Sequence, residues 1–373
     1  MQLNASPYRL MITGGGTGGH IFPAVAVATE FRSRFPDSDV LFVGAKGRME
    51  MTRVPEAGFR IIGLWISGFQ RRLTISNLLL PLKMLVSYIK AHRLISRFRP
   101  HAVVGTGGYA SGPLMFAAVH RGVPTVIQEQ NSYAGMANKQ LASSASSICV
   151  AYDGMEKYFP AAKVKLTGNP VRRNILQEGL SREEAARKFG LDPSKKIILV
   201  VGGSLGARTL NQCIEKGAAE LEKENVQVIW QTGKLYYQAM VASAAASQKN
   251  IVVLDFIQDM AAAYAAADLV ISRAGALAIS ELCIAGKPVV LVPSPHVAED
   301  HQTKNAMALV NKGAARVVKD SEAVNNLVSE VLTLLRQPEV CSSLSSSIRA
   351  MARPEATKEI VEEIVQLIKT SAR

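Results

Sequence analysis

The sequence predicts an α/β protein with two Rossmann-like domains, each built on a parallel sheet. The chain has 373 residues, about twice the length of a typical domain. A short apolar run leads through a glycine cluster into a helical pattern near the N-terminus, and the same order recurs in the second half. Short apolar runs also alternate with helical patterns along both halves, which is typical of βαβ units.

The first half begins with an apolar run at Arg9–Thr13, followed by the glycine cluster Gly14–Gly19 and a helix predicted over Ala24–Phe35. Glycines at this position allow the tight strand-to-helix turn of nucleotide-binding domains. Further strands are predicted in this half at Val40–Val43, Ala102–Val104, Thr125–Ile127 and Ile148–Ala151.

The second half repeats this order with the run Lys196–Val201, the glycine cluster Gly202–Gly206 and a helix predicted over Thr209–Glu222. Its other predicted strands are Val228–Gln231, Ile251–Leu254, Leu269–Ser272 and Pro288–Val292. Because these runs are apolar throughout, we expect them to be buried on both faces of a parallel sheet.

The turn residues Gly168–Pro170 are a candidate hinge between the halves. We therefore expect an N-terminal domain at residues 1–168 and a C-terminal domain at residues 169–350. The remaining residues, 351–373, contain a helix predicted over Ala356–Lys369. Its apolar side chains share one face and must pack on something. We expect this helix to pack back toward the N-terminal domain.

The charge balance indicates an anionic partner. Lys and Arg total 43, Asp and Glu total 30, and the net charge is +13. Nucleic acid, anionic lipid and phosphorylated substrates all fit this charge. A nucleic-acid-binding protein is disfavoured because the basic residues are spread over both halves, aromatic residues make up only 6%, and no recognition motif occurs.

Cysteine usage and hydropathy indicate where such a chain works. Cys149, Cys213, Cys283 and Cys341 are widely spaced and form no metal-binding or disulfide pattern, so we expect buried thiols in a reducing compartment. The apolar run Leu10–Ile12 is too short for a signal peptide. The uncharged stretch Ala102–Val119 is interrupted by glycines and a proline, so no transmembrane helix is expected.

Glycine clusters that precede helices are candidate phosphate sites, because unpaired N–H groups and the positive end of the helix dipole meet there. The sequence has three, at Gly14–Gly19, Gly105–Gly112 and Gly202–Gly206. They predict two phosphorylated ligands, or one diphosphate held by both domains. None matches the P-loop motif, and no acidic residue ends the strand Val40–Val43 as NAD binding requires.

Two acidic motifs are candidate ligand-binding groups. Asp37–Asp39 resembles a metal-holding D-x-D, but it precedes its strand and is interpreted as a solvated turn. Glu281 lies in the second turn of a helix that follows Gly275, where its carboxylate could accept from both ribose hydroxyls of a nucleoside diphosphate. The alternative, that Glu281 only complements the helix dipole, stays open.

A set of motifs occurs in order along essentially the whole chain: Gly15–His20 with Phe22 and Pro23, Gly107–Pro113, Glu129–Asn131, Gly168–Arg172, Gly202–Arg208, Asp255–Ile257, Arg273–Leu277 and His301–Ala306. Together they resemble the MurG family of bacterial N-acetylglucosaminyltransferases. The resemblance implies a GT-B fold with a deep cleft. It implies inverting transfer of GlcNAc from UDP-GlcNAc to the MurNAc 4-hydroxyl of lipid I, which forms lipid II for peptidoglycan. A UDP-GlcNAc 2-epimerase, related in fold but without a lipid acceptor, is the alternative.

The resemblance also implies site residues. His20 would be the general base, since an imidazole accepts a proton near neutral pH, or would only orient the substrate. The acceptor diphosphate would be held by Gly15, Gly16, Gly107, Gly108 and Tyr109. The donor UDP-GlcNAc would be held by Thr17, Gly18, Gly19, Asn131, Arg172, Ser204, Ile257 (backbone, at the uracil), Ala276, Leu277, Glu281 (at the ribose) and Gln302 (at the sugar), with His301 or Asn305 as further candidates.

The resemblance implies neither a metal nor a cofactor. Leu205 departs from the family, in which many members have Gln at this position, so a contact to the donor is lost there or supplied elsewhere. The family works as a peripheral protein on the cytoplasmic side of the bacterial inner membrane, and other cell-wall synthesis proteins are further candidate partners.

A membrane surface is predicted at residues 68–99. Ile75, Leu78, Leu79, Leu82, Leu85, Val86 and Ile89 recur at helical spacing, which predicts a core-facing stripe for most of them. Leu73, Leu80 and Met84 fall off that face, beside Arg71, Arg72, Lys83, Lys90 and Arg93. This mixture of apolar and basic groups is typical of helices that bind anionic lipid surfaces.

Overall fold

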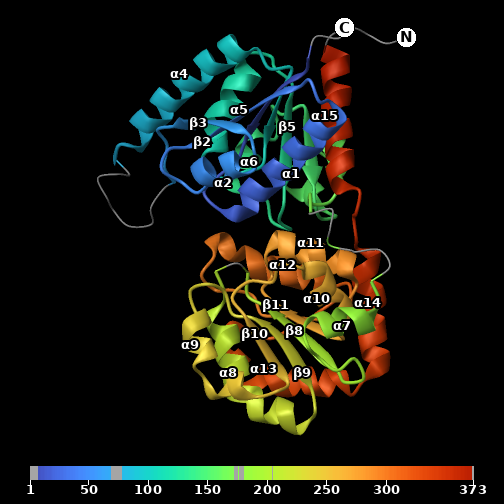
Figure 1. The fold of residues 1–373 in the computed structure, drawn as a ribbon. Helices are drawn as coiled ribbons and strands as arrows, with labels where there is room; N and C mark the ends of the chain where they lie inside the picture. Colours follow the sequence, from blue (N-terminus) through green and yellow to red (C-terminus); the bar gives the residue numbers. More distant parts are fainter. Residues whose placement is uncertain (1–6, 69–77, 172–174, 176–179, 204, 372–373) are drawn as a thin grey trace. The chain divides into compact units, whose positions relative to one another are not determined.

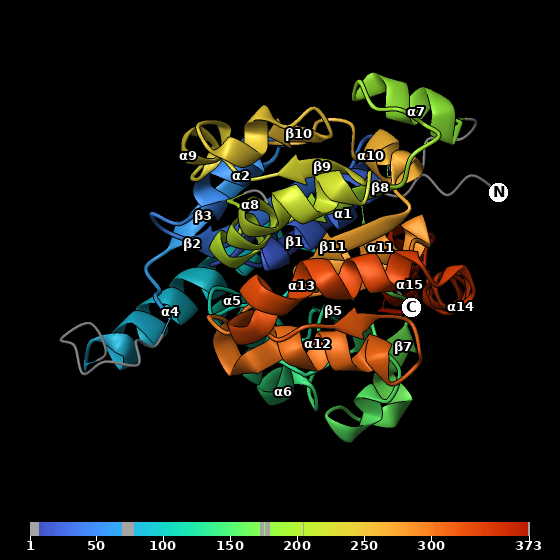
Figure 2. The same cartoon turned by 90° about the horizontal axis from the view of Figure 1, so that it is seen from below.

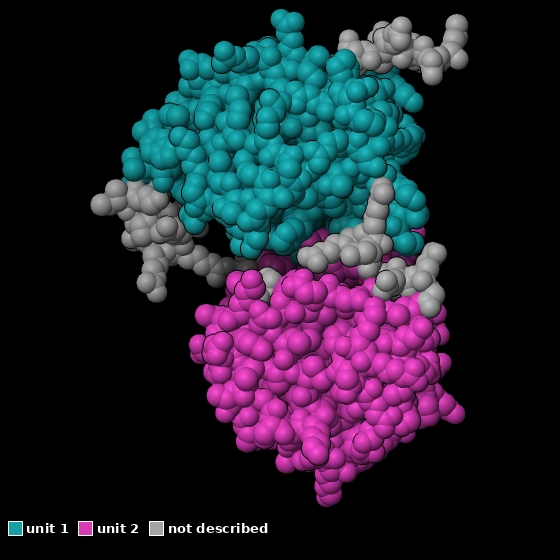
Figure 3. Space-filling view, viewed as in Figure 1, with its two compact units in different colours: residues 1–171, 354–373 teal, residues 172–353 magenta. Residues whose placement is uncertain are grey.

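The computed structural model describes residues 7–68, 78–171, 175, 180–203 and 205–371. The chain folds into two compact units, Met1–Val171 with Pro354–Arg373 and Arg172–Arg353 (Figure 3). Each unit contains one sheet, and all recorded strand pairs are parallel. The predicted fold class is therefore confirmed.

Unit 1 contains a seven-stranded sheet in the order β3-β2-β1-β4-β5-β6-β7. The strands are β1 (Arg9–Thr13), β2 (Asp39–Ala45), β3 (Arg60–Leu64), β4 (Ala102–Gly105), β5 (Thr125–Glu129), β6 (Ser147–Val150) and β7 (Val164–Leu166). The helices are α1 (Gly18–Arg34), α2 (Glu50–Glu56), α4 (Leu80–Phe98), α5 (Ser111–His120), α6 (Met136–Leu141) and α15 (Ala356–Ser371), with short 3-10 turns at Met155–Lys157 and Ala161–Lys163.

The core of unit 1 joins both ends of the chain. Leu10 and Ile12 of β1 pack with Phe31 of α1, and five apolar residues of α15 complete the same cluster: Ile360, Val361, Ile364, Val365 and Ile368. Helices α1 and α15 lie side by side (Figure 1), and Arg34 forms an ion pair with Glu362. The terminal helix is thus part of this core.

Unit 2 contains a six-stranded sheet in the order β10-β9-β8-β11-β12-β13. The strands are β8 (Ile197–Val201), β9 (Gln227–Gln231), β10 (Ile251–Leu254), β11 (Leu269–Ser272), β12 (Val289–Leu291) and β13 (Arg316–Val317). The helices are α7 (Arg182–Lys188), α8 (Arg208–Lys223), α9 (Tyr237–Val241), α10 (Met260–Ala266), α11 (Ala276–Ala285), α12 (His301–Val310), α13 (Asp320–Leu335) and α14 (Pro338–Ala350), with 3-10 turns at Ala244–Ser247 and Ala298–Asp300.

The core of unit 2 is centred on the buried Trp230 of β9. Its indole N–H donates to Oδ1 of Asn211 at 3.0 Å, so the polar atom of this large side chain is satisfied. Helices α8 and α13 lie side by side (Figure 2). Gly217 permits this contact, because a Cβ there would collide with the side chain of Val328.

Both sheets have the same switch point. β1 lies between β2 and β4, and β8 lies between β9 and β11. The chain therefore leaves each first strand on one side and returns on the other. In open α/β sheets, ligands bind beyond the carboxyl ends of the strands at this point. The glycine clusters after β1, β4 and β8 all lie there.

Helix α1 begins at Gly18, earlier than predicted, because Thr17 has extended backbone angles (φ −146°, ψ 158°) and serves as its N-cap. The glycine cluster thus supplies the first turn of the helix. The strands β3, β7 and β13 were not predicted. All three are edge strands, and β7 and β13 are only three and two residues long.

Helix α4 buries the face opposite to the one that its sequence predicts to be buried. The residues assigned to a core stripe are exposed: Leu78, Leu79, Leu82, Leu85, Val86 and Ile89, here called the α4 apolar stripe. The buried face instead carries Lys83, Ser87, Ala91 and Ile95. Polar groups are buried there because they have partners. Nζ of Lys83 donates to Oγ of Ser67 at 3.0 Å, and Oγ of Ser87 donates to the Trp65 carbonyl at 2.9 Å.

Three of the thiols are buried as expected, and burial raises the pKa of Cys149, Cys213 and Cys283 to about 12. Thiols of such high pKa are unreactive at neutral pH. Cys341 is only partly buried. No helix in the described ranges has the length and apolar character needed to span a membrane.

Candidate functional site

The loops after β1 and β4 lie next to each other because these strands are paired, with Thr13 opposite Gly105. Gly107 and Gly108 of the second loop have left-handed backbone angles (φ 97° and 81°). A Cβ on Gly107 would lie 3.0 Å from Nδ1 of His20, and one on Gly108 would lie 3.2 Å from Cδ2 of that ring. The two glycines are required both for the turn and for the close approach of the imidazole.

The hydrogen bonds of His20 define its tautomer. Nδ1 lies 2.9 Å from the carbonyl oxygen of Thr106 and 3.0 Å from Oε1 of Gln130. Both neighbours are acceptors, so Nδ1 carries the proton. In the neutral ring, Nε2 is then left with a lone pair, which is the form that a general base requires.

The side chain of Gln130 is held in one orientation. Its Nε2 donates to the Thr106 carbonyl at 2.7 Å, to the Gln128 carbonyl at 3.0 Å, and to Oε1 of Gln128. Reversing the amide would turn its oxygen toward these acceptors, so Oε1 must face His20. Asn169 extends the network, accepting from Gln128 at 2.9 Å and donating to the Gln130 carbonyl at 3.0 Å. All three amide side chains are buried.

A buried carboxylate supports the first glycine loop. Glu50 accepts from the Gly16 N–H at 3.1 Å and from the Ala45 N–H at 2.9 Å, and it is fully buried. A Cβ on Gly15 would collide with this carboxylate. The N–H of Gly16 is therefore engaged by Glu50, and a contact from Gly16 to the acceptor diphosphate stays a prediction. The N–H groups at the start of α1, from Gly18 and Gly19, remain the donors that such a position supplies.

Tyr109 covers the first loop from the second. A Cβ on Gly16 would lie 3.0 Å from Cε1 of the Tyr109 ring, and one on Gly68 would lie 2.9 Å from its Cδ1. Burial raises the pKa of Tyr109, so its hydroxyl stays protonated at neutral pH. The side chain is a neutral hydrogen-bonding group beside the glycine loop.

Asn131 is positioned by a second buried carboxylate. Glu129 at the end of β5 accepts from the Asn131 N–H at 3.1 Å and from its Nδ2 at 3.3 Å. The other oxygen accepts from the Gly135 N–H at 2.9 Å and from Nδ2 of Asn138 at 2.8 Å. Glu129 therefore orders the loop that carries Asn131. Thr17 is exposed at the start of α1.

In unit 2, the glycine loop after β8 is closed mainly by backbone. The Gly206 N–H donates to the Gly203 carbonyl at 3.0 Å, and both glycines have left-handed angles (φ 80° and 84°). Gln231 links this loop to the next one. Its Nε2 donates to the Gly203 carbonyl at 3.0 Å, and its Oε1 accepts from the Ile257 N–H at 2.9 Å. The Ile257 N–H is thus bonded to Gln231. Of the Ile257 backbone groups expected at the uracil, the carbonyl is therefore the one we expect to bind it.

The start of α11 faces open space. Gly275 is the N-cap of α11 and, in the part of the chain that the structure describes, no side chain caps it. A Cβ on Gly275 would meet no described atom within 4 Å. Ala276 and Leu277 form the first turn, and the partly exposed Glu281 lies in the second. Arg273 points away from this position, because it pairs with Asp320 and donates to the Val292 carbonyl at 3.0 Å.

Helix α12 carries Gln302, whose amide nitrogen has no hydrogen bond with the described residues, and Asn305, whose side chain is buried. Oε1 of Gln302 accepts from the Ser294 N–H at 2.9 Å, so its Nε2 points the other way and is the atom suited to a sugar hydroxyl. Asn305 is fully buried and donates to the Ala274 carbonyl at 3.4 Å. Asn305 thus supports the Arg273–Gly275 loop, and a contact from Asn305 to the sugar stays a prediction. His301 is partly exposed.

Several predicted residues lie outside the described residues: Arg71, Arg72, Leu73, Ile75, Arg172 and Ser204. For the membrane surface, Leu80 is half-buried and Met84 is exposed. Asp39 is the first residue of β2 and forms an ion pair with Arg60 at the protein surface.

Over the described ranges, no cluster of His, Cys, Asp or Glu able to hold a metal ion is found.

Two Rossmann-like units, each with a glycine loop at the switch point of its sheet, have the architecture of the GT-B fold. Family models give the class of enzyme, a glycosyltransferase: residues 10–150 match the glycosyltransferase family 28 N-terminal domain, and residues 197–363 match its C-terminal domain. The MurG structure from Acinetobacter baumannii is 31% identical, covers 96% of this chain and 100% of its own, and has a TM-score of 0.79.

Curated relatives narrow the class. The UDP-N-acetylglucosamine--N-acetylmuramyl-(pentapeptide) pyrophosphoryl-undecaprenol N-acetylglucosamine transferase of Cytophaga hutchinsonii is 53% identical over 98% of this chain and 99% of its own length. The Bacteroides fragilis enzyme of the same name is 56% identical over 97% and 96%. The chain belongs to this family, the MurG glycosyltransferases. A UDP-GlcNAc 2-epimerase from Neisseria meningitidis, at 15% identity and a TM-score of 0.65, shares the fold alone.

Proposed function

We propose that this enzyme transfers GlcNAc from UDP-GlcNAc to the MurNAc 4-hydroxyl of lipid I, with inversion, and so forms lipid II for peptidoglycan synthesis. The observation that carries this proposal is the identity of 53% over 98% of the chain to an enzyme named for that transfer. The geometry of His20 supports the chemistry. We assign donor binding to unit 2 and acceptor binding to unit 1.

In the proposed reaction, Nε2 of His20 accepts the proton of the attacking hydroxyl. The oxygen forms a bond to C1 of GlcNAc as the bond from C1 to the UDP oxygen breaks, so the configuration inverts. The resulting imidazolium is stabilised because its Nδ1–H already donates to Thr106 and Gln130. Charge on the departing UDP is stabilised by the Gly202–Gly206 loop and the start of α11.

Binding roles follow the described contacts. In unit 2, we assign the Ile257 carbonyl to the uracil, Glu281 to the ribose, the first turn of α11 to the diphosphate, and Nε2 of Gln302 to the sugar. In unit 1, we assign the acceptor diphosphate to the start of α1 and the Gly107–Tyr109 loop, with Thr17 and Asn131 as further contacts. This assignment differs from the expectation from the resemblance, which placed Thr17, Gly18, Gly19 and Asn131 at the donor.

The experiment supplies labelled UDP-GlcNAc and lipid I to the purified protein and follows the label into the lipid-extractable fraction. Labelled lipid with the disaccharide of lipid II supports the proposal. Label confined to free sugar, or to an epimerised nucleotide sugar, would replace it with a hydrolase or an epimerase.

We also propose that α4 docks this enzyme on the cytoplasmic face of the inner membrane. The support is the α4 apolar stripe, in which Leu78 is 81% and Leu85 is 56% exposed, since contiguous exposed apolar surface marks interaction sites. A lipid-linked acceptor requires a membrane surface nearby. The basic contribution is smaller than expected, because Lys83 and Lys90 point inward, Lys90 donating to the Gly63 carbonyl at 2.8 Å. Arg93 and Arg97 remain exposed.

A further inference from the structure

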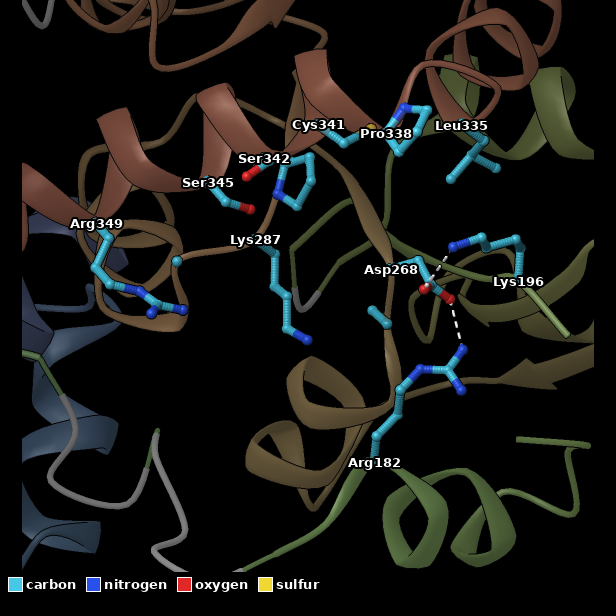
Figure 4. A pocket seen from close by; sticks show the side chains of 13 residues that line it. Arg182, Lys196, Asp268, Lys287, Leu335, Pro338, Cys341, Ser342, Ser345 and Arg349 are labelled. Atoms are coloured by element: carbon cyan, nitrogen blue, oxygen red, sulfur yellow. Dashed lines mark hydrogen bonds and ion pairs between the residues drawn. The ribbon is translucent and has the colours of Figure 1, made fainter. Parts of the chain in front are cut away.

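A cavity of about 330 Å³ lies in unit 2, away from the donor loops (Figure 4). Its floor is formed by residues that precede three neighbouring strands: Lys196 before β8, Asp268 before β11, and Lys287 and Pro288 before β12. It therefore lies at the amino ends of the strands whose carboxyl ends lead into the donor loops. The lining is completed by α14 and by Arg182 of α7.

The cavity has more positive charge than its own carboxylate balances. Four basic side chains, Arg182, Lys196, Lys287 and Arg349, line it with the single acid Asp268. That acid is already engaged: Arg182 donates to it at 2.6 Å, the Ile197 N–H donates to it at 2.8 Å, and Lys196 lies 3.4 Å away.

Lys287 and Arg349 are left without a carboxylate in the described part of the chain. Nζ of Lys287 has one long hydrogen bond, of 3.3 Å, to the Ala265 carbonyl. Burial lowers the pKa of Lys287, and the nearby Arg182 and Arg349 lower it further against the opposing effect of Asp268. An anion would relieve this repulsion at the partly buried Lys287.

Helix α14 adds neutral donors on the same side. Ser342, Ser345 and Arg349 follow one another at three- and four-residue steps, so they share one face of the helix. Figure 4 shows both hydroxyls and the Arg349 guanidinium directed to the side on which Lys287 lies. For neither hydroxyl is a protein hydrogen bond found with the residues that the structure describes. Hydroxyls, an ammonium and a guanidinium together are the donors that phosphate oxygens accept.

We propose that this cavity binds a phosphate-bearing anion, at a site separate from the UDP-GlcNAc site. The lining contains no aromatic side chain, so nothing there stacks on a nucleobase. The ligand class is a small phosphate ester or inorganic polyphosphate, free in solution or carried as a lipid headgroup.

The test measures binding of inorganic pyrophosphate to the full-length protein by calorimetry, with saturating UDP present to occupy the donor loops. Wild type should bind, and Lys287→Met should weaken binding about tenfold or more, the effect of losing one charge-assisted hydrogen bond. Lys223→Met is the matched control, because Lys223 is exposed in the last turn of α8 and its loss changes the net charge equally. It should bind as wild type does.

Ser345→Ala is the milder second variant, with an expected weakening of a few-fold, and unchanged UDP affinity verifies that unit 2 is folded in each variant. Glycerol phosphate and phosphatidylglycerol vesicles are then compared with wild type and with Lys287→Met. The source is free if Lys287→Met weakens only glycerol phosphate binding, and lipid-borne if it also weakens vesicle binding, which the α4 apolar stripe would otherwise supply alone. The proposal is overturned if wild type fails to bind pyrophosphate at millimolar concentration, or if Lys287→Met and Lys223→Met bind equally. In that case the cavity holds only a structural ion cluster. Failure here leaves the transferase assay unaffected, so the two proposals are tested separately.

Discussion

The glycine loops after β1 and β8 follow the same kind of strand and lead into the same kind of helix, yet they are held differently. The β1 loop is fixed by side chains from elsewhere in unit 1, with Glu50 holding Gly16 while Thr106 and Gln130 hold His20. The β8 loop is fixed by its own backbone and by Gln231. The β1 loop carries the His20 imidazole with its proton on Nδ1. The β8 loop carries a tight glycine turn close to the start of a helix. In the proposed function, one local pattern thus supports catalysis in one unit and binding in the other.

The largest effect should come from His20. His20→Ala is expected to lower kcat by about 10²–10⁴-fold, the usual contribution of a general base. UDP affinity should stay unchanged, because the ring belongs to unit 1 and the donor loops belong to unit 2. Steady-state kinetics with saturating lipid acceptor, together with UDP calorimetry, measure the two effects. Near-normal turnover would mean that another group is the base.

A substitution of Glu281 tests the proposed donor-binding role of unit 2. Glu281→Ala should weaken UDP binding by about 1.5–3 kcal/mol, because both ribose hydroxyls lose a charged acceptor. Calorimetry with UDP measures this loss. Glu330→Ala is the matched control, since Glu330 is exposed on α13 and should leave the affinity unchanged. Equal affinities for the two variants would remove Glu281 from the donor site.

Gln130 sharpens the comparison, because it acts only through His20. In Gln130→Met the Nδ1–H of His20 loses one acceptor, so the imidazolium formed in the proposed reaction is less stable. We expect kcat to fall about tenfold, the effect of one hydrogen bond, while UDP affinity stays unchanged.

Gln227→Met supplies the control, since Gln227 is buried and its side chain, among the described residues, bonds to the backbone of Asp192 and not to His20. It should leave kcat unchanged. If Gln130→Met lowers kcat no more than Gln227→Met does, Gln130 has only a packing role. Nitrogen-15 NMR of labelled histidine adds a direct reading, in which the wild-type His20 signal should be that of a ring protonated at Nδ1.

The smallest effect is expected on α4. Val86→Glu should weaken binding to phosphatidylglycerol vesicles by about tenfold or less, because one partly exposed apolar side chain leaves the lipid surface. Co-sedimentation measures this binding, which should also weaken as salt screens Arg93 and Arg97. Val241→Glu is closely matched, since Val241 is 45% exposed and Val86 is 39% exposed. Equal vesicle binding by the two variants would place the membrane surface elsewhere.

The sheets could be predicted from the sequence because the signals are local. β10 and β11 have the predicted bounds, since their apolar runs end at turn residues. The partners of the site residues are not local. Glu50 reaches Gly16 across 34 residues of chain and Gln130 reaches His20 across 110, and no spacing rule connects them. Which face of α4 is buried could not be predicted either. Lys83 and Ser87 are buried because their side chains bond to Ser67 and Trp65, which precede the helix in the chain.

The terminal helix α15 has a consequence for the order in which the protein can be completed. Unit 1 combines the first and the last segments of the chain, and its core needs Ile360 and Ile364 of α15 beside Phe31 of α1. A ribosome delivers the whole of Arg172–Arg353 before it delivers α15. The unit that emerges first is therefore finished last. Until α15 has been synthesised and has left the ribosome, the surface of α1 that α15 covers stays open to chaperones and to aggregation, while unit 2 already has all of its own residues.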